Sequence, residues 1–222
     1  MDNDNKKDFS KVFMIAGSEP LGSCGIQADI KAVSACGGFA AGAITLIVDM
    51  DTTSVKGIRT MPVDLILSQS RHFLSDVGAD CIKTGMLYEK QIVEAVAGLL
   101  REYPDIPKVI DPVMVDSGGT SLINADAVEA YREHLFPQAE IITPNIHEAR
   151  VLAGEDITLD NADLVIRRLA DPGCSVIIKS IPNGDNLTDI FYNRRTDTVR
   201  RFSKRRMRPA MSTARETLSV PR

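Results

Sequence analysis

The chain has 222 residues, of which 44% are hydrophobic and 25% are charged, and its formal net charge is −4. These values are typical of a single globular domain with a core of useful size. Nucleic-acid binding is not expected of such an acidic chain, and no apolar run approaches the roughly 20 residues that span a bilayer. Because the N-terminal residues are polar and lack a signal-peptide pattern, we expect a cytoplasmic protein.

Cysteine and histidine do not indicate a metal site. The four cysteines are widely spaced and form no C-x-x-C pair: Cys24, Cys36, Cys81 and Cys174. The three histidines also lack the spacing of metal ligands: His72, His134 and His147. We therefore expect reduced thiols, and neither a zinc site nor a disulfide framework.

In chain order, the hydrophobic pattern alternates between strands and helices. It predicts strands at residues 12–16, 43–48, 80–83, 108–111, 140–143 and 175–179, helices at 26–36, 63–74, 92–100, 127–135 and 164–169, and a final hairpin of 188–192 and 198–202. This alternation predicts an α/β fold with a mostly parallel central sheet and helices on both faces. Ligands are then expected at the carboxyl ends of the strands, where the loops gather.

The glycine-rich loop after the first predicted strand, residues 17–25, does not match the common phosphate-binding loops. Glu19 stands where a dinucleotide fingerprint needs glycine, which disfavours a nicotinamide-dependent oxidoreductase. A P-loop would need lysine and serine or threonine where Ser23 and Cys24 stand. Its glycines would let the backbone approach a ligand closely, but taken alone such a loop is more often a plain strand-to-helix turn than a binding site. Asp29 on the following helix could simply face solvent near the positive end of the helix dipole.

Several residues at later strand ends could serve either a ligand or the fold itself. Asp111 ends a buried strand directly before a proline, so it needs either a magnesium ion or a hydrogen-bond donor as a partner. Asn145 and Glu148 share a face at the start of a helix, as phosphate and Mg²⁺ ligands or as a capping box. Lys179 ends another strand and could meet nucleotide phosphates as a point charge. Met86 could line a ligand pocket or belong to the core.

Four segments together resemble the hydroxymethylpyrimidine/phosphomethylpyrimidine kinase family. Residues 16–31, AGSEPLGSCGIQADIK, are similar to the family opening A-G-S-D-x-S-G-G-A-G-I-Q-A-D-L-K. Residues 83–87, 111–115 and 143–149 match later family motifs in order and spacing. The resemblance covers about residues 10–203 and implies a ribokinase-like three-layer sandwich, incomplete at its C-terminus.

The resemblance also implies an activity and a set of site residues. The family transfers the γ-phosphate of ATP, with Mg²⁺, to hydroxymethylpyrimidine or to its phosphate in thiamine synthesis. The resemblance implies that the substrate pocket is lined by Gly17, Asp29, Met50, Met86 and Val113. For the metal, Asp111 and Glu148 are implied, and for the nucleotide phosphates, Asn145 and Lys179. A homodimer acting on a small-molecule substrate is the assembly that the resemblance suggests.

Two departures from the family pattern bear on the substrate. Glu19 replaces the usual aspartate, which alters the reach of the loop. Met50 aligns where pyrimidine-specific members carry a glutamine that hydrogen-bonds the substrate ring, and methionine cannot make that bond. Related enzymes that phosphorylate pyridoxine or pyridoxal carry an apolar residue there, so a pyridoxine/pyridoxal kinase of vitamin B6 salvage is the alternative.

The final residues depart from the family altogether. Residues 204–222 carry six basic residues and one acidic residue, a net charge of +5, which leaves −9 for residues 1–203. The family continues here into a loop H-G-T-G-[C/D]-T that cradles the transferred phosphoryl group and supplies the presumed catalytic residue. Since no such loop occurs in this chain, we leave the catalytic residue unassigned and expect little kinase activity. Residues 1–203 then form a partial kinase domain, and residues 204–222 are an aberrant basic tail.

We propose a change of reading frame as the origin of the tail. With suitable codons for residues 211–221, the bases read from the third position of the Met211 codon give V-H-G-T-G-D-T-L-S-S, which contains the missing motif. The genomic DNA across codons 203–222 tests this hypothesis directly. The alternatives are a natural basic tail and, as a function of another class, a non-catalytic remnant that binds the small molecule without phosphorylating it.

Overall fold

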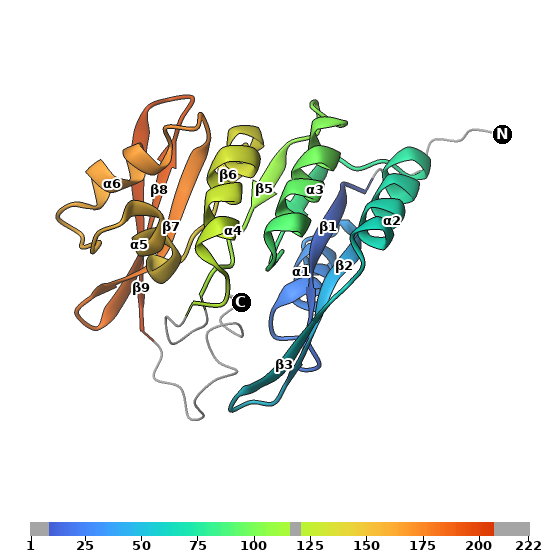
Figure 1. The fold of residues 1–222 in the computed structure, drawn as a ribbon. Helices are drawn as coiled ribbons and strands as arrows, with labels where there is room; N and C mark the ends of the chain where they lie inside the picture. Colours follow the sequence, from blue (N-terminus) through green and yellow to red (C-terminus); the bar gives the residue numbers. More distant parts are fainter. Residues whose placement is uncertain (1–8, 116–120, 207–222) are drawn as a thin grey trace.

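The computed structural model describes residues 9–115 and 121–206, and they build one nine-stranded sheet (Figure 1). Across the sheet, the strands are β3 (Val55–Thr60), β2 (Phe39–Met50), β1 (Lys11–Ser18), β4 (Cys81–Thr84), β5 (Lys108–Ile110), β6 (Ile141–Ile142), β7 (Ser175–Asn183), β8 (Asn186–Asn193) and β9 (Thr198–Arg205). Strands β2, β1, β4, β5, β6 and β7 pair in parallel, whereas the β2–β3, β7–β8 and β8–β9 pairs are antiparallel.

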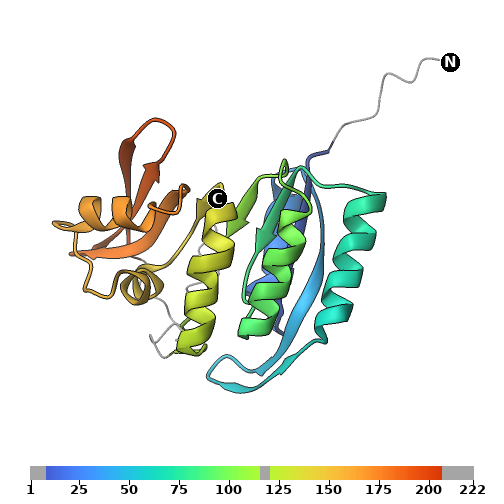
Figure 2. The ribbon, with the colours of Figure 1, turned by 45° about the horizontal axis from the view of Figure 1, so that its top comes forward.

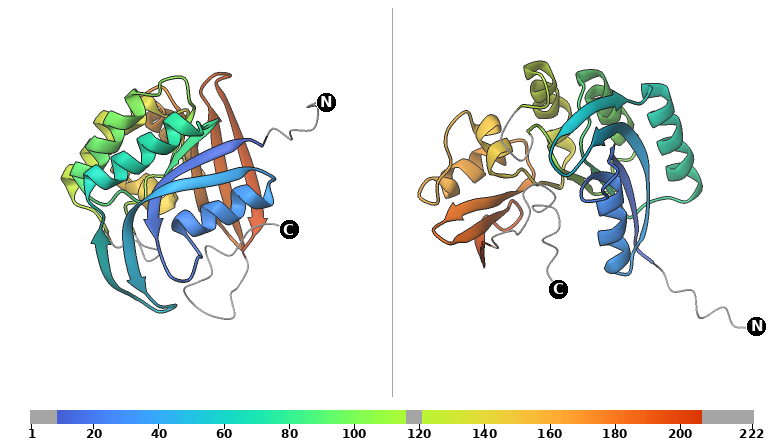
Figure 3. Two further views of the ribbon diagram at one scale, coloured as in Figure 1. Left: turned by 90° about the vertical axis from the view of Figure 1, so that its right-hand side faces the viewer. Right: turned by 90° about the horizontal axis from the view of Figure 1, so that it is seen from below.

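Helices lie on both faces of this sheet. They are α1 (Gly25–Ala35), α2 (Val63–Asp76), α3 (Lys90–Arg101), α4 (Ala125–Ala130), α5 (Ile146–Ala153) and α6 (Ala162–Leu169). Helices α2, α3 and α4 lie side by side on one face (Figure 2). Within the described part of the chain, α1 is the one helix on the opposite face (Figure 3, right). The layers are therefore helix, sheet and helix, as expected for parallel βαβ units.

The main core forms between the sheet and the helices α2 to α6. Buried residues of every strand from β1 to β8 except β3 contribute to it, as do the apolar stripes of the helices. Helix α3 shows why the sequence folds this way, because its apolar residues recur at helical spacing and are fully buried: Ile92, Val93, Val96, Leu99 and Leu100. A smaller cluster of Met14, Ala16 and Ile26 joins α1 to the other face.

The predicted α/β fold, with its mostly parallel sheet, is confirmed. The six parallel strands, the five helices and the β8–β9 hairpin all occur near their predicted positions. Three features differ from the expectation. Strand β2 is longer than 43–48 and pairs with β3, which was not predicted. The helix expected at 127–135 becomes a π-helix from Tyr131 to Leu135 and a 3₁₀ turn from Phe136 to Gln138. The strand expected to end at residue 179 runs to Asn183.

No helix among residues 9–115 and 121–206 is both long and apolar enough to cross a membrane. Most of the basic tail predicted at residues 204–222 lies outside the described residues, which end at residue 206. Strand β9 itself continues to Arg205, two residues past the predicted end of the kinase domain.

Candidate active site

The carboxyl ends of five neighbouring strands are held side by side by backbone hydrogen bonds. Four such bonds join the chain at this edge: Gly85 N to Ile15 O (2.9 Å), Asp111 N to Thr84 O (3.0 Å), Thr143 N to Ile110 O (3.0 Å) and Lys179 N to Pro144 O (2.9 Å). Gly85, Asp111 and Thr143 directly follow their strands, whereas Lys179 lies within β7. The polar residues at this edge are therefore neighbours in space. This is the edge where a parallel α/β sheet binds its ligands.

Asp111 lies at the centre of this edge. Its Oδ1 atom accepts hydrogen bonds from the Lys179 ammonium at 2.9 Å and from the Thr143 hydroxyl at 3.0 Å. The Nζ atom of Lys83 lies 3.9 Å from the other carboxylate oxygen, Oδ2. Burial alone would raise the pKa of Asp111, but the positive charges of Lys179 and Lys83 hold that pKa below its usual value. The carboxylate is thus ionised and paired, as a buried carboxylate must be.

A bulge in β7 shapes the backbone beside Lys179. The pairing with β8 shifts between Ile178 and Ile181, and Ser180 adopts a positive φ of 63° that is unusual for a residue with a side chain. The carboxylate of Asp189 on β8 holds this turn by accepting a hydrogen bond from Ser180 N at 2.7 Å. Irregular strand ends of this kind commonly re-aim a side chain next to a binding site. Here the lysine ammonium contacts Asp111.

Asn145 and Glu148 form the N-terminal cap of α5. The Asn145 side chain accepts from the backbone N–H groups of His147 (2.8 Å) and Glu148 (2.9 Å), and Glu148 Oε2 accepts from Asn145 N at 2.7 Å. This is the complete capping box that the sequence left open as an alternative. Asn145 also pairs with Lys179 in an isolated parallel bridge, so the cap lies beside the lysine.

Glu148 is the second carboxylate of this edge, and its pKa is raised, whereas that of Asp111 is lowered. Its side chain is buried, and burial together with the negative charge of Asp111 raises its pKa to about 7. The Asn145 N–H and the Lys179 ammonium oppose that rise only in part. The pair therefore holds one ionised carboxylate and one that exchanges a proton near neutral pH.

Asp29 joins the same cluster from the opposite face of the sheet. It lies on α1 and forms an ion pair with Lys83 at 2.7 Å, and both side chains are largely buried, with 23% and 19% of their surface exposed. The exposed helix-face alternative for Asp29 is therefore wrong. Lys83 in turn links Asp29 to Asp111, so the candidate residues of the first loop region and of β5 meet through one lysine.

The first loop is closed by Glu19. Its buried carboxylate accepts hydrogen bonds from the backbone N–H groups of Leu21, Ser23 and Cys24, and from the Ser23 hydroxyl. Although burial tends to raise the pKa of Glu19, these donors hold it below its usual value. The longer side chain thus works as an internal anion that shapes the loop, and the change from aspartate is structurally accommodated.

Gly17 and Gly25 allow the loop to approach the strand. A Cβ atom on Gly25 would lie 2.4 Å from the carbonyl oxygen of Gly17, and Gly25 has a φ of +61°. A Cβ on Gly17 would lie 2.8 Å from Leu46 Cδ1 of β2. A side chain at position 17 would therefore press on Leu46 between β1 and β2, whatever the role of Gly17 toward a substrate.

The remaining predicted substrate residues lie near strand ends. Met86 follows β4 and is half-buried, and its carbonyl oxygen accepts from Thr45 Oγ1 at 2.7 Å. Val113 is half-buried in the turn after β5, where its N–H donates to Asp111 O at 2.9 Å. Met50 ends β2 and pairs with Val55 of the β2–β3 hairpin. Within the described residues, no hydrogen bond or ion pair joins Met50 to the charged cluster.

The donor set fits a magnesium ion that is carried by a nucleotide. Among the described residues, no group of three or more histidine, cysteine or carboxylate side chains could hold a metal. Mg²⁺ commonly binds through one or two carboxylates and completes its shell with water and phosphate oxygens. Asp111 and Glu148 match that smaller requirement, and Lys179 adds a positive charge for phosphate.

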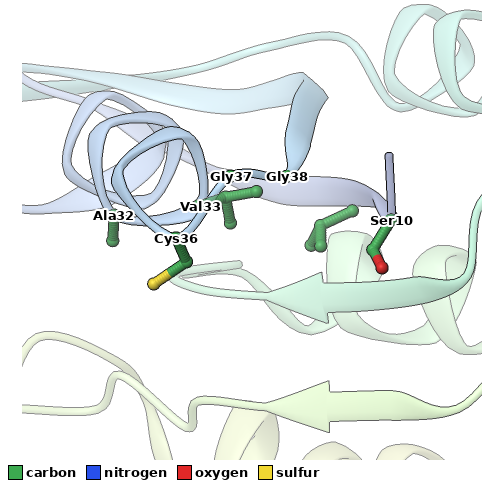
Figure 4. A pocket seen from close by; sticks show the side chains of 7 residues that line it. Ser10, Ala32, Val33, Cys36, Gly37 and Gly38 are labelled. Atoms are coloured by element: carbon green, nitrogen blue, oxygen red, sulfur yellow. The ribbon is translucent and has the colours of Figure 1, made fainter. Parts of the chain in front are cut away.

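A small pocket at the other edge of the sheet does not contain any of these residues (Figure 4). It has a volume of about 340 Å³ and lies between the end of α1 and the start of β1, with Val12, Val33 and Cys36 in its wall. Because it faces the amino end of β1, it is separate from the charged edge described above.

Lys83 is a member of the charged cluster to which the sequence analysis assigns no role, although it opens the family motif at residues 83–87. The available signal was strand parity. Lys83 pairs with Met14 of β1, which lies on the α1 face, so the lysine projects toward the same face as Asp29.

The sheet order and the helix layers are those of the ribokinase-like fold, which this chain shares with solved small-molecule kinases. The phosphomethylpyrimidine kinase of Clostridium difficile 630 has a TM-score of 0.80 at 29% identity, over 87% of this chain and 84% of that chain. The ADP complex of Bacillus subtilis pyridoxal kinase has a TM-score of 0.82 at 30% identity, over 91% of this chain and 78% of that chain.

The chain belongs to the phosphomethylpyrimidine kinase family, whose sequence profile matches residues 19–215. It is 35% identical to the hydroxymethylpyrimidine/phosphomethylpyrimidine kinase of Bacillus subtilis strain 168 over 187 residues, which are 82% of this chain and 69% of that protein. It is 42% identical to the thiamine biosynthesis multifunctional protein ThiED of Corynebacterium efficiens over 183 residues. That match covers 79% of this chain but only 25% of the larger protein.

Proposed function

We propose that this chain binds Mg²⁺ and ATP together with hydroxymethylpyrimidine or its phosphate, for phosphoryl transfer in thiamine synthesis. The observation that carries the proposal is the position of Asp111, which lies between Lys179 and Lys83 at the carboxyl edge of the sheet. Membership of the phosphomethylpyrimidine kinase family supports the reaction class. Action in the cytoplasm, as a homodimer, stays a prediction.

Each residue has a separate task in this proposal. Lys179 binds phosphate oxygens as a point charge, and Asp111 and Glu148 hold the metal side of the nucleotide. When bound, Mg²⁺ neutralises negative charge on the phosphates during transfer. Asp29 contacts the polar edge of the heteroaromatic alcohol, while Gly17, Met86 and Val113 provide close backbone approach and apolar walls. Phosphoryl transfer depends mainly on such positioning and charge stabilisation.

In the ligand-free chain, the lysines neutralise Asp111. The incoming phosphates offer Lys179 a stronger anionic partner, and this frees an oxygen of Asp111 for the cation. Metal and nucleotide should therefore bind together more tightly than either binds alone. The catalytic acid or base stays unassigned, because the family loop that would supply it does not occur in this sequence.

Pyridoxine or pyridoxal phosphorylation is the second candidate. Met50 favours it, since methionine cannot hydrogen-bond a pyrimidine edge. The pyridoxal kinase of Staphylococcus aureus, solved with AMP-PCP and pyridoxal, also shares the fold, with a TM-score of 0.78 at 29% identity. A non-catalytic protein that binds the small molecule is the alternative of another class, favoured by the unassigned catalytic residue.

Binding measurements on the 222-residue protein separate these functions. Calorimetric titrations with hydroxymethylpyrimidine, with pyridoxal and with the ATP analogue AMP-PCP plus Mg²⁺ should show one preferred ring compound and nucleotide binding. Transfer from radiolabelled ATP is then measured with the preferred compound. Ring binding without nucleotide binding or transfer would support the non-catalytic alternative, and a protein that binds none of these ligands would contradict the proposal.

A matched pair of variants tests the site itself. Asp111→Asn should abolish detectable binding of Mg²⁺ with AMP-PCP, and because the variant leaves Lys179 without its anionic partner, circular dichroism of the ligand-free protein checks that it is still folded. Asp160→Asn changes an exposed carboxylate away from the strand ends and should leave nucleotide binding unchanged. Equal nucleotide affinity in both variants would remove Asp111 from the site.

A further inference from the structure

Lys83 connects two carboxylates that the proposed function assigns to different ligands. Its Nζ atom lies 2.7 Å from Asp29 Oδ2 on α1 and 3.9 Å from Asp111 Oδ2 after β5. The ammonium is therefore a full ion-pair partner of Asp29 and a more distant neighbour of Asp111. The lysine side chain is 19% exposed, so its charge acts in a largely buried environment.

The strand and its loop make room for this lysine. Lys83 pairs with Met14 on one side and with Val109 on the other, in the middle of the parallel sheet. A Cβ atom on Gly85 would lie only 3.4 Å from Lys83 Nζ, and 2.9 Å from Ala16 Cβ. The glycine two residues further along thus leaves space for the ammonium at the strand ends.

The two carboxylates depend on Lys83 to different degrees. Asp111 keeps the Lys179 ammonium and the Thr143 hydroxyl as partners if Lys83 loses its charge. For Asp29, Lys83 is the one ion-pair or hydrogen-bond partner of the carboxylate among residues 9–115 and 121–206. Loss of the lysine charge therefore releases the Asp29 carboxylate. Asp111 stays held by its other partners, but the electrostatic potential around its carboxylate becomes more negative.

We infer that Lys83 is a positioning residue that holds Asp29 ready for the ring substrate and limits the affinity of Asp111 for a cation. This inference rests on the proposed function, and it adds a residue to which no ligand contact is assigned. It predicts effects of opposite sign at the two carboxylates. Without the lysine charge, the ring substrate binds more weakly at Asp29, and a divalent cation binds more tightly at Asp111. A general packing defect would weaken both.

The experiment compares Lys83→Met with Lys83→Arg and with Lys90→Met, which removes an exposed lysine of α3. The dissociation constants of hydroxymethylpyrimidine and pyridoxal are measured by calorimetry. The affinity for Mn²⁺ alone is measured by loss of the free-ion electron paramagnetic resonance signal. For Lys83→Met we expect ring-compound affinity to fall on the order of 10- to 100-fold, the range for losing one charged hydrogen bond, and Mn²⁺ to bind severalfold more tightly. Lys83→Arg should recover much of the ring affinity, and Lys90→Met should match the unmodified protein.

A double-variant cycle checks that Lys83 acts through Asp29. Once Asp29→Asn is present, adding Lys83→Met should weaken ring binding by no more than about twofold. Unchanged ring affinity in Lys83→Met, or parallel losses of ring and Mn²⁺ affinity, would overturn the inference. Failure of the unmodified protein to bind either ring compound or Mn²⁺ would overturn the proposed function instead, so the two results are distinguishable.

Discussion

Glu148 should make the stability of the ligand-free protein fall as the pH rises toward neutrality. Its side chain is only 2% exposed, and burial and the charge of Asp111 raise its pKa from the ordinary 4.5 to about 7. The folded protein therefore binds a proton that the unfolded chain has lost, between about pH 4.5 and 7. Stability from this group is complete below pH 4.5 and is lost as the pH rises through 7.

The size of the effect follows from the two pKa values. A rise from 4.5 to about 7 implies that the free energy of unfolding falls by roughly 2 to 3 kcal/mol between pH 5 and pH 8. Groups with a lowered pKa, such as Asp111 and Glu19, act in the opposite direction but only at more acidic pH. Glu148 is thus the main source of the slope in this window.

Glu148→Gln is the matched change. Glutamine can still close the capping box by accepting from Asn145 N, but it cannot titrate. Urea unfolding of both proteins, followed by circular dichroism from pH 5 to pH 8 without metal or nucleotide, gives the two slopes. We expect most of the slope to vanish in Glu148→Gln. An equal slope in the two proteins would refute the assignment of the raised pKa to this carboxylate.

Three further results are expected. Gly42→Ala should lower the free energy of unfolding by about 1–3 kcal/mol, because its Cβ would lie 2.3 Å from Met14 O. In the control Gly57→Ala, the new Cβ meets nothing within 4 Å, so its free energy of unfolding should be nearly unchanged. Thermal melting of both variants gives the comparison. Glu19→Gln should cost about 1–3 kcal/mol at pH 7, because an amide places donors against backbone N–H groups, and the difference should shrink as the pH falls below 4.5 and through the lowered pKa of the Glu19 carboxylate; a difference that does not shrink on acidification would contradict this. Lys179→Met should weaken binding of AMP-PCP with Mg²⁺ at least tenfold but leave ring-compound affinity within about twofold in calorimetry; the reverse pattern would show that this lysine serves the ring compound.

The alternation of elements could be predicted because it depends on local periodicity. Buried parallel strands give short apolar runs, and helices such as α3 give stripes at helical spacing. Strand β3 escaped prediction because residues 55–60 mix polar and apolar residues at the edge of the sheet, where they become a strand by pairing with β2. The π-helix at Tyr131–Leu135 depends on tertiary packing, for which the sequence carries no simple local signal.

Some contacts of the candidate site could also be predicted from the sequence, and others could not. Asp111 and Lys179 could be predicted as neighbours, because parallel strands carry both residues toward one edge of the sheet, although β7 continues past Lys179 to Asn183. The capping box of Asn145 and Glu148 has a sequence signature, so that alternative was visible and is now confirmed. Strand parity indicates which face of the sheet Lys83 projects toward, but it does not identify Asp29 as the partner, since that contact joins residues 54 positions apart and depends on how α1 packs on the sheet.

A crystal structure of this chain with Mn²⁺ and AMP-PCP tests most directly whether the strand ends hold a metal-bound nucleotide. The anomalous signal of manganese locates the ion independently of any model of the ligand. We predict one peak at coordination distance from Asp111 or Glu148, with the phosphates beside Lys179. A metal–nucleotide complex bound elsewhere on the protein, with the Asp111–Lys179 ion pair intact, would contradict the account.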